Sequence, residues 1–333
     1  MNIVITGSIA YDYLMHFPGD FMDHVKPDRI QKLSLSFLVD DMVKQRGGCA
    51  PNIAYTLALL GERPLVMGTA GEDFPEYGAW LESHGIDISA VKVVPDVFTA
   101  SFFATSDEAQ NQIASFYTGA MAYARELSFY DLSQPVDLTV VSPNDPEAMD
   151  KYPRECRELG IPYLYDPSQQ VVRASGDMLR AGMQGAHILI VNDYEYELLK
   201  DRTGMNDDDI RQVVKQAVIV THGAEGAVIW SANDTGSTGR DWEEIHIPAA
   251  TPGAILDPTG VGDAFRGGLL KGLALELPWA ECGRLGSVAA IYVLETKGPQ
   301  AHTFTVEEFT ARYIANFGED AATKALYNRS DLV

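Results

Sequence analysis

Short apolar runs alternate with helical patterns through most of this 333-residue chain. Runs typical of buried strands lie at residues 3–8, 65–70, 136–142, 162–165, 186–191, 218–221, 227–230 and 245–247. Helical spacing is found at residues 145–159, 262–275 and 279–294, and at 307–317, which we expect to be a last surface helix. Strands that alternate with helices form a parallel sheet covered by helices on both faces. We therefore expect an α/β fold.

Composition excludes several classes of partner. A formal charge of −22 argues against a general nucleic-acid or anionic-membrane surface, because both select for basic patches. No apolar run approaches the roughly 18 residues of a membrane span, and the first residues are typical of a strand, not of a signal peptide. The three cysteines, Cys49, Cys156 and Cys282, are too scattered for a disulfide framework or a metal site. We expect a cytoplasmic protein.

The segment DPTGVGDAFRGGLLK, residues 257–271, carries the clearest chemistry. Gly260 and Gly262 flank Val261, which lets successive amides point the same way and form an anion-binding nest. A helix that begins there adds unpaired N–H donors and its positive dipole end. Asp263 could take a proton from a hydroxyl held against that nest, which suits phosphoryl transfer. The alternative is an ordinary turn with a capping Asp.

Other candidate residues are each compatible with a purely structural role. Asp12 follows the first strand, where open α/β sheets bind ligands, but it could be a solvated loop residue. Asn192 and Glu195 form a helix-capping pair. Runs at 99–105 and 112–117 predict a β-hairpin. Its aromatic residues could stack on a flat base or only pack the hairpin; they are Phe102, Phe103, Phe116 and Tyr117.

Four motifs in order resemble those of the ribokinase family, the phosphofructokinase-B-type carbohydrate kinases. Asp-Pro-Thr-Gly-Val-Gly-Asp is similar to the second signature of the family, usually Asp-Thr-Thr-Gly-Ala-Gly-Asp. Gly47-Gly48, with Asn52 four residues later and a following helix, resembles its first signature. Asn-x-x-Glu at 192–195 and Thr-x-Gly-x-x-Gly at 221–226 lie between them. A Walker motif is absent, and so is Gly-x-Gly-x-x-Gly after the first strand.

The resemblance covers roughly residues 1–317 and implies a fold. It indicates one ribokinase-like domain over residues 1–333, a three-layer α/β/α sandwich with a mostly parallel central sheet. A small β-sheet lid over the substrate would be formed by about residues 13–45 and 98–120. The lid could also join two subunits, so the chain is expected to be a monomer or a homodimer through the lid.

The resemblance also implies transfer of the ATP γ-phosphate to a primary hydroxyl, with Mg²⁺ bridging the phosphates. Asp263 would be the general base, and the amides of Gly260, Val261 and Gly262 would hold the transferring charge. The residues expected to orient the acceptor are Asp12, Gly48 and Asn52. The residues expected at ATP are Asn192, Thr221, Gly223, Gly226 and Gly262, with Asn192 and Glu195 in the outer shell of the magnesium.

The acceptor is indicated by a second set of resemblances. The run NQIASFYTGAM, residues 111–121, is similar to a stretch of adenosine kinases and makes Gln112 and Phe116 candidate substrate contacts. Arg266 directly after Asp-Ala-Phe and the segment ETKGPQ at 295–300 favour the same branch. They imply phosphorylation of adenosine to AMP. A kinase of a free sugar, such as ribose or fructose, and a non-catalytic nucleoside-binding protein are the alternatives.

Overall fold

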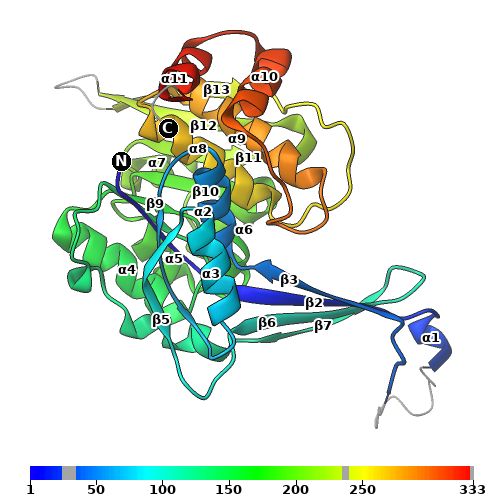
Figure 1. The fold of residues 1–333 in the computed structure, drawn as a ribbon. Helices are drawn as coiled ribbons and strands as arrows, with labels where there is room; N and C mark the ends of the chain where they lie inside the picture. Colours follow the sequence, from blue (N-terminus) through cyan, green and yellow to red (C-terminus); the bar gives the residue numbers. More distant parts are fainter. Residues whose placement is uncertain (25–34, 235–239, 331–333) are drawn as a thin grey trace.

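The computed structural model describes residues 1–24, 35–234 and 240–330, and within them two β-sheets (Figure 1). The large sheet has the strand order β13-β12-β11-β10-β9-β8-β1-β4-β5. Its strands are β1 Ile3–Thr6, β4 Leu65–Ala70, β5 Asp87–Val93, β8 Leu138–Val141, β9 Tyr163–Tyr165, β10 Ile188–Asn192, β11 Ala217–Thr221, β12 Ala227–Asp234 and β13 Arg240–Ile247. Neighbours from β5 to β11 pair in parallel, whereas β12 and β13 run antiparallel at one edge.

Helices cover both faces of this sheet. They are α2 Cys49–Leu59, α3 Pro75–Ser83, α4 Pro146–Leu159, α5 Gly176–Met183, α6 Asp193–Thr203, α7 Asp207–Val213, α8 Val261–Ala274 and α9 Trp279–Leu294. Two further helices, α10 Val306–Phe317 and α11 Ala321–Ser330, pack against α9. The short helix α1 Phe21–His24 lies apart from this sheet, at the far end of the smaller one (Figure 1). Short 3₁₀ helices are η2 Gly119–Glu126, η3 Phe129–Asp131, η4 Ser168–Val172 and η5 Gly223–Glu225.

Alternate residues of each central strand enter different layers of the core. In β1, Ile3 and Ile5 join a cluster with side chains of α2, α3 and α8, whereas Val4 joins a cluster with α4, α5 and α6 on the opposite face. Successive strand residues point to opposite faces, so a strand buried on both sides is apolar throughout. The expectation of a three-layer α/β/α fold is therefore confirmed.

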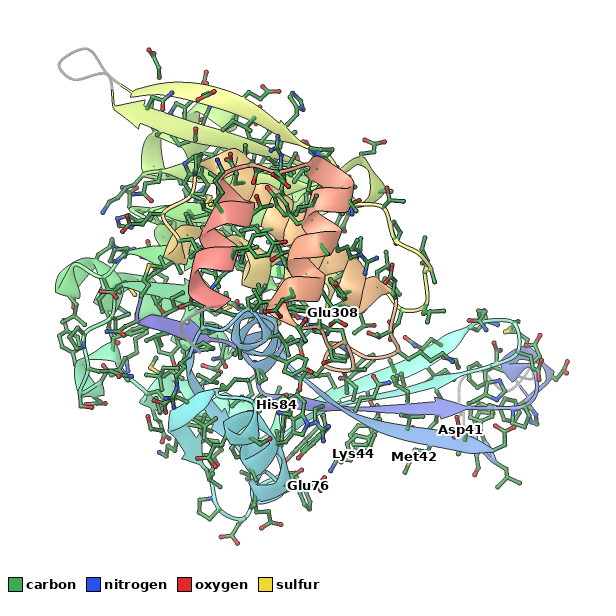
Figure 2. The ribbon with its side chains drawn as sticks, turned by 45° about the horizontal axis from the view of Figure 1, so that its top comes forward. Asp41, Met42, Lys44, Glu76, His84 and Glu308 are labelled. Atoms are coloured by element: carbon green, nitrogen blue, oxygen red, sulfur yellow. The ribbon has the colours of Figure 1, made fainter. Side chains whose placement is uncertain are left out.

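The second sheet forms an arm beside this body, visible on the right of Figure 1. Its order is β3-β2-β6-β7, with β2 Ala10–His16, β3 Asp41–Gly47, β6 Ala100–Ser106 and β7 Gln112–Tyr117. Antiparallel pairing of β6 with β7 confirms the expected hairpin. Figure 2 labels Asp41, Met42 and Lys44 along β3 in this arm, which we call the lid sheet.

Several expectations need correction. Asp12 lies inside β2 and not in a loop after the first strand, because the chain turns directly from β1 into the lid sheet at Ala10. The helix predicted at 307–317 is neither last nor merely a surface helix, since α11 follows it and Phe309 and Tyr313 are fully buried against α9 and α11. Residues 25–34 of the expected lid segment lie outside the described residues. No described helix is long and apolar enough to cross a bilayer.

Candidate active site

The first turn of α8 presents unpaired amides beside a carboxylate. Gly260 caps the helix in the left-handed region at φ 80°, where a side chain is strained, and a Cβ there would lie 2.5 Å from Cβ of Pro299. Within the described chain, the amides of Gly260 and Gly262 have no backbone partner, whereas that of Val261 donates to the Pro258 carbonyl at 3.3 Å. This end of α8 lies near the carboxyl end of β9, because Arg266 of α8 bonds to Asp166, the residue that follows that strand. An anion is the natural ligand there.

Asp263 meets Asn52 at this helix end. Asn52 Nδ2, from the first turn of α2, donates to Asp263 Oδ2 at 2.8 Å across 211 positions of sequence. Burial raises the pKa of Asp263, although the Arg266 guanidinium and the Asn52 hydrogen bond act in the opposite direction. The contact joins the two sequence motifs that resemble the family signatures into one group. A carboxylate with a raised pKa is a stronger base once it is ionised.

Asp12 lies where the lid sheet meets the body. Its carboxylate packs against the backbone of Gly47, since a Cβ added to Gly47 would lie 2.7 Å from Asp12 Oδ2. Burial, reinforced by the negative charge of Asp257, raises the pKa of Asp12 to about 6. Gly48, at φ 96°, passes so close to the Ser8 carbonyl that a side chain would overlap it. The described residues give the Asp12 carboxylate no hydrogen-bond partner, which leaves it available to hydroxyl donors.

The register of the lid sheet decides which aromatic residues share a face with Asp12. Asp12 pairs with Phe102 of β6, and Phe102 pairs with Phe116 of β7. Side chains of directly paired residues project from the same face of a sheet. Gln112 is on that face too but stands four residues, about 13 Å, farther along β7, and the structure does not bring it to Asp12. Phe103 points to the other face, where it stacks on Tyr13 at 4.8 Å.

Asn192 and Glu195 form the expected capping box at the start of α6. Asn192 Oδ1 accepts from the Glu195 amide at 2.7 Å, and Glu195 Oε2 accepts from the Asn192 amide at 2.9 Å. The other oxygen, Oε1, accepts from the Ser168 hydroxyl at 3.3 Å. Within residues 1–24, 35–234 and 240–330, no group of three or more His, Cys, Asp or Glu side chains could enclose a metal ion. This pair therefore suits a hydrated cation held through water better than a direct cage.

The turn after β11 carries the remaining expected ATP contacts. Thr221 ends the strand, and Gly223 and Gly226 both have positive φ, at 55° and 96°. A side chain on Gly226 would overlap the Ile247 carbonyl at the end of β13, so this position accepts only glycine. The turn follows directly on β11, which is the neighbour of β10 and hence of Asn192.

Two residues that the sequence did not single out as an ion pair lie under Asp263. Arg266 Nη2 donates to Asp166 Oδ1 at 2.5 Å, and both side chains are buried. Burial raises the pKa of Asp166 to about 6, despite the opposing effect of Arg266. Two signals could have indicated the pair: Asp166 directly follows a buried strand, and Arg266 is three residues after Asp263 and so on the same helix face. Their pairing across 100 positions was not predictable.

Tyr77 and Gln300 complete the surroundings of Asn52, and no sequence pattern pointed to Tyr77. Gln300 Nε2 donates to Asn52 Oδ1 at 2.7 Å and to the Tyr77 hydroxyl at 2.6 Å. A cavity of about 330 Å³ lined by residues of β4 and β5, including Lys92, lies elsewhere and contains none of the side chains described above.

The chain is similar to known proteins along almost its whole length. The profile of the pfkB family carbohydrate kinases matches residues 15–305. A nucleoside kinase from Burkholderia thailandensis, solved in complex with inosine, is 37% identical with a TM-score of 0.82, covering 95% of this chain and 98% of that one. The same enzyme has been solved in complex with ADP-inosine, at 38% identity and a TM-score of 0.80 over 95% and 96%. A nucleoside kinase from Methanothermobacter thermautotrophicus is 27% identical over 95% of this chain and 97% of that protein.

Proposed function

Because this chain belongs to the pfkB family of carbohydrate kinases, we propose that it transfers the γ-phosphate of ATP to the primary hydroxyl of a nucleoside, with adenosine as the preferred acceptor. Members of this family are ATP-dependent phosphotransferases that act on an alcohol group. The nucleoside acceptor is supported by the similarity to two nucleoside kinases along almost the whole chain. The observation that carries the mechanism is the contact of Asn52 with Asp263 at the N-terminus of α8.

Asp263 acts as the general base. Its carboxylate takes the proton of the acceptor hydroxyl as that oxygen bonds to the γ-phosphorus. The bond from the γ-phosphorus to the bridging oxygen breaks, and ADP leaves with that electron pair. Proton transfer to a positioned base contributes about 10²- to 10⁴-fold to a rate. The hydrogen bond from Asn52 occupies Oδ2 and leaves Oδ1 for the acceptor.

The amides at the start of α8 hold the charge of the transferring group. Those of Gly260 and Gly262 have no partner in the part of the chain that the structure describes, and each such donor contributes about 3 kcal/mol in well-studied oxyanion sites. Val261 contributes less in this conformation, because its amide already donates within the turn. The Val261 amide can donate to the phosphate only if its hydrogen bond to the Pro258 carbonyl opens when the phosphate binds.

The acceptor lies between the lid sheet and the body, with its ribose hydroxyls on Asp12, Gly48 and Asn52. Phe102 and Phe116 share the Asp12 face and offer a stacking surface for the base. The position of Gln112 near the hairpin turn gives its proposed contact no support.

ATP occupies the edge formed by the α6 N-terminus and the turn at Thr221, Gly223 and Gly226. Asn192 and Glu195 suit a magnesium ion that keeps its water shell, because their inward oxygens are already hydrogen-bonded and Mg²⁺ releases water reluctantly. When bound, magnesium neutralises charge on the β- and γ-phosphates.

The lid sheet also supports a homodimer. Met42 and Ile113 are exposed apolar side chains on one face of this sheet, and burying such a surface is a common reason for pairing. Sedimentation velocity on the wild type and on Met42→Lys tests it. A dimer that the substitution weakens supports pairing through the lid sheet, and a wild-type monomer rejects it.

The decisive experiment measures ADP release with Mg-ATP and a panel of adenosine, inosine, other nucleosides, ribose and fructose. Asp263→Asn is compared with Asp208→Asn, an exposed Asp on α7. If ADP release is fastest with adenosine and is lost only in Asp263→Asn, both the proposed acceptor and the proposed general base are supported. Fastest release with another nucleoside changes the nucleobase proposed for the acceptor. Fastest release with a free sugar rejects the nucleoside proposal. Tight adenosine binding without ADP release would indicate a non-catalytic binding protein.

A further inference from the structure

A chain of buried hydrogen bonds connects Asp263 with the end of the lid sheet. It runs from Asp263 to the Asn52 amide at 2.8 Å, from Asn52 Oδ1 to Gln300 Nε2 at 2.7 Å, and from there to the Tyr77 hydroxyl at 2.6 Å. The Tyr77 hydroxyl donates to the carbonyl oxygen of Gly47, the last residue of β3, at 2.9 Å. Asn52, Tyr77 and Gln300 are only 6%, 1% and 8% exposed, so water does not compete for these bonds.

The donor and acceptor of every hydrogen bond in this series are determined by the group at one end, Asp263. An ionised Asp263 only accepts, so Asn52 must present its NH₂ group to Asp263 and its oxygen to Gln300. Gln300 must then present its own NH₂ group, and both of its protons are used, on Asn52 and on Tyr77. Tyr77 accepts from Gln300 and therefore donates its hydroxyl proton to the Gly47 carbonyl.

The orientation of Gln300 leaves one polar atom unpaired. Its Oε1 atom is buried and has no partner among the residues that the structure describes. Buried acceptors are rarely left unsatisfied, and each needs an explanation. The reversed amide would place that oxygen against Asn52 Oδ1, where two acceptors repel. The unpaired atom is thus the consequence of holding Asn52 in the orientation that serves Asp263.

We propose that Gln300 is a positioning residue for phosphoryl transfer, which fixes the Asn52 amide against Asp263, and that Tyr77 links this amide pair to the lid strand at Gly47. The proposal rests on the role of Asp263 as base in the proposed function. Gly47 also packs beneath the Asp12 carboxylate. This series of hydrogen bonds therefore connects the base with the end of β3, against which the acceptor-binding Asp12 of β2 packs.

Removing Gln300 leaves Asn52 free to rotate away from Asp263. In Gln300→Leu we expect kcat to fall about 10- to 100-fold, since small misplacements of reacting groups cost up to about 100-fold, while KM for ATP stays within about 3-fold. The hydrogen bond from Asn52 lowers the pKa of Asp263, so its loss raises that pKa and moves the acid limb of the kcat profile to higher pH. A purely structural role of Gln300 would lower stability without moving this limb.

The test combines these variants with a double-variant cycle. If Gln300 acts through Asn52, then Gln300→Leu has little further effect on kcat in an Asn52→Ala background. Tyr77→Phe should give a smaller loss than Gln300→Leu. Its matched control is Tyr152→Phe, which removes the same hydroxyl-to-carbonyl hydrogen bond, Tyr152 to Ala124 at 2.6 Å, in a fully buried position of α4. That control should keep wild-type kcat.

Several outcomes overturn the proposal. A kcat within 2-fold of wild type in Gln300→Leu would do so, as would losses that simply multiply in the double variant. If Gln300→Leu does not fold, Gln300→Glu keeps the shape and removes the donor, with the same expected shift of the acid limb. Turnover that survives in Asp263→Asn would reject the base assignment separately. The coupling of Gln300 to Asn52 is then judged from the nucleoside dissociation constants of the single and double variants, measured by calorimetry. Losses of binding free energy that simply add in the double variant reject the coupling.

Discussion

Replacing Asp12 by Asn should stabilise the unliganded protein and weaken the binding of its acceptor. The Asp12 carboxylate lies against the Gly47 backbone, is partly buried, and is repelled by Asp257. These effects raise its pKa from 3.8 to about 6. At about 1.4 kcal/mol for each pH unit, ionising Asp12 at neutral pH costs the folded state about 3 kcal/mol. Because the side chain retains some solvent contact, the observable gain in Asp12→Asn is about 1–3 kcal/mol.

The sign of this effect depends on pH in a defined way. A carboxyl whose pKa is raised by folding favours the folded state when protonated, so its contribution is fully present below pH 3.8 and is lost as pH rises through about 6. The Asn variant carries no such charge. The difference in unfolding free energy between variant and wild type should therefore be near zero at pH 4, grow up to pH 6, and stay constant above pH 7.

Urea unfolding followed by circular dichroism between pH 4 and 8 measures this difference. Asp41→Asn, an exposed Asp on β3 of the same lid sheet, is the control and should change stability by less than about 0.5 kcal/mol. Calorimetry on the same samples should show weaker nucleoside binding in Asp12→Asn only. A variant that is less stable than wild type at pH 7, or a difference that does not vary with pH, would refute the reasoning.

Two further substitutions test the rest of the site. Gly260→Ala should lower stability by about 1–3 kcal/mol through its left-handed φ and its overlap with Pro299, and should lower kcat more than 10-fold. Gly61→Ala, at a similar φ of 83° but in open space, is its control in urea unfolding and in kcat, and should leave kcat unchanged. Arg266→Met should cost about 3–5 kcal/mol by leaving the buried Asp166 carboxylate without its ion-pair partner, with only the Ser142 hydroxyl still bonded to it. Thermal unfolding should show most of this loss restored when Asp166→Asn is added, and no recovery would count against the pair.

Local features of this protein follow from local sequence. The parallel strands could be predicted because a strand buried on both faces is apolar throughout, as in β1 and β10. The capping pair Asn192 and Glu195 could be predicted because the two residues are three positions apart in one helix turn. The same applies to the glycines before Asp263, whose backbone conformation depends on their own φ angles.

The contacts that assemble the site depend on tertiary structure. Asn52 reaches Asp263 across 211 positions, and Gln300 reaches Asn52 across 248, so no sequence spacing records either bond. Strand periodicity tells which residues of β2 share a face, but pairing register alone places Phe102 and Phe116 beside Asp12. Sequence by itself determined the elements and the glycine turn before Asp263, because these depend on near neighbours. Packing of α2 on α8, and of the lid sheet on the body, decided which side chains meet, since such contacts form only when the whole chain has folded.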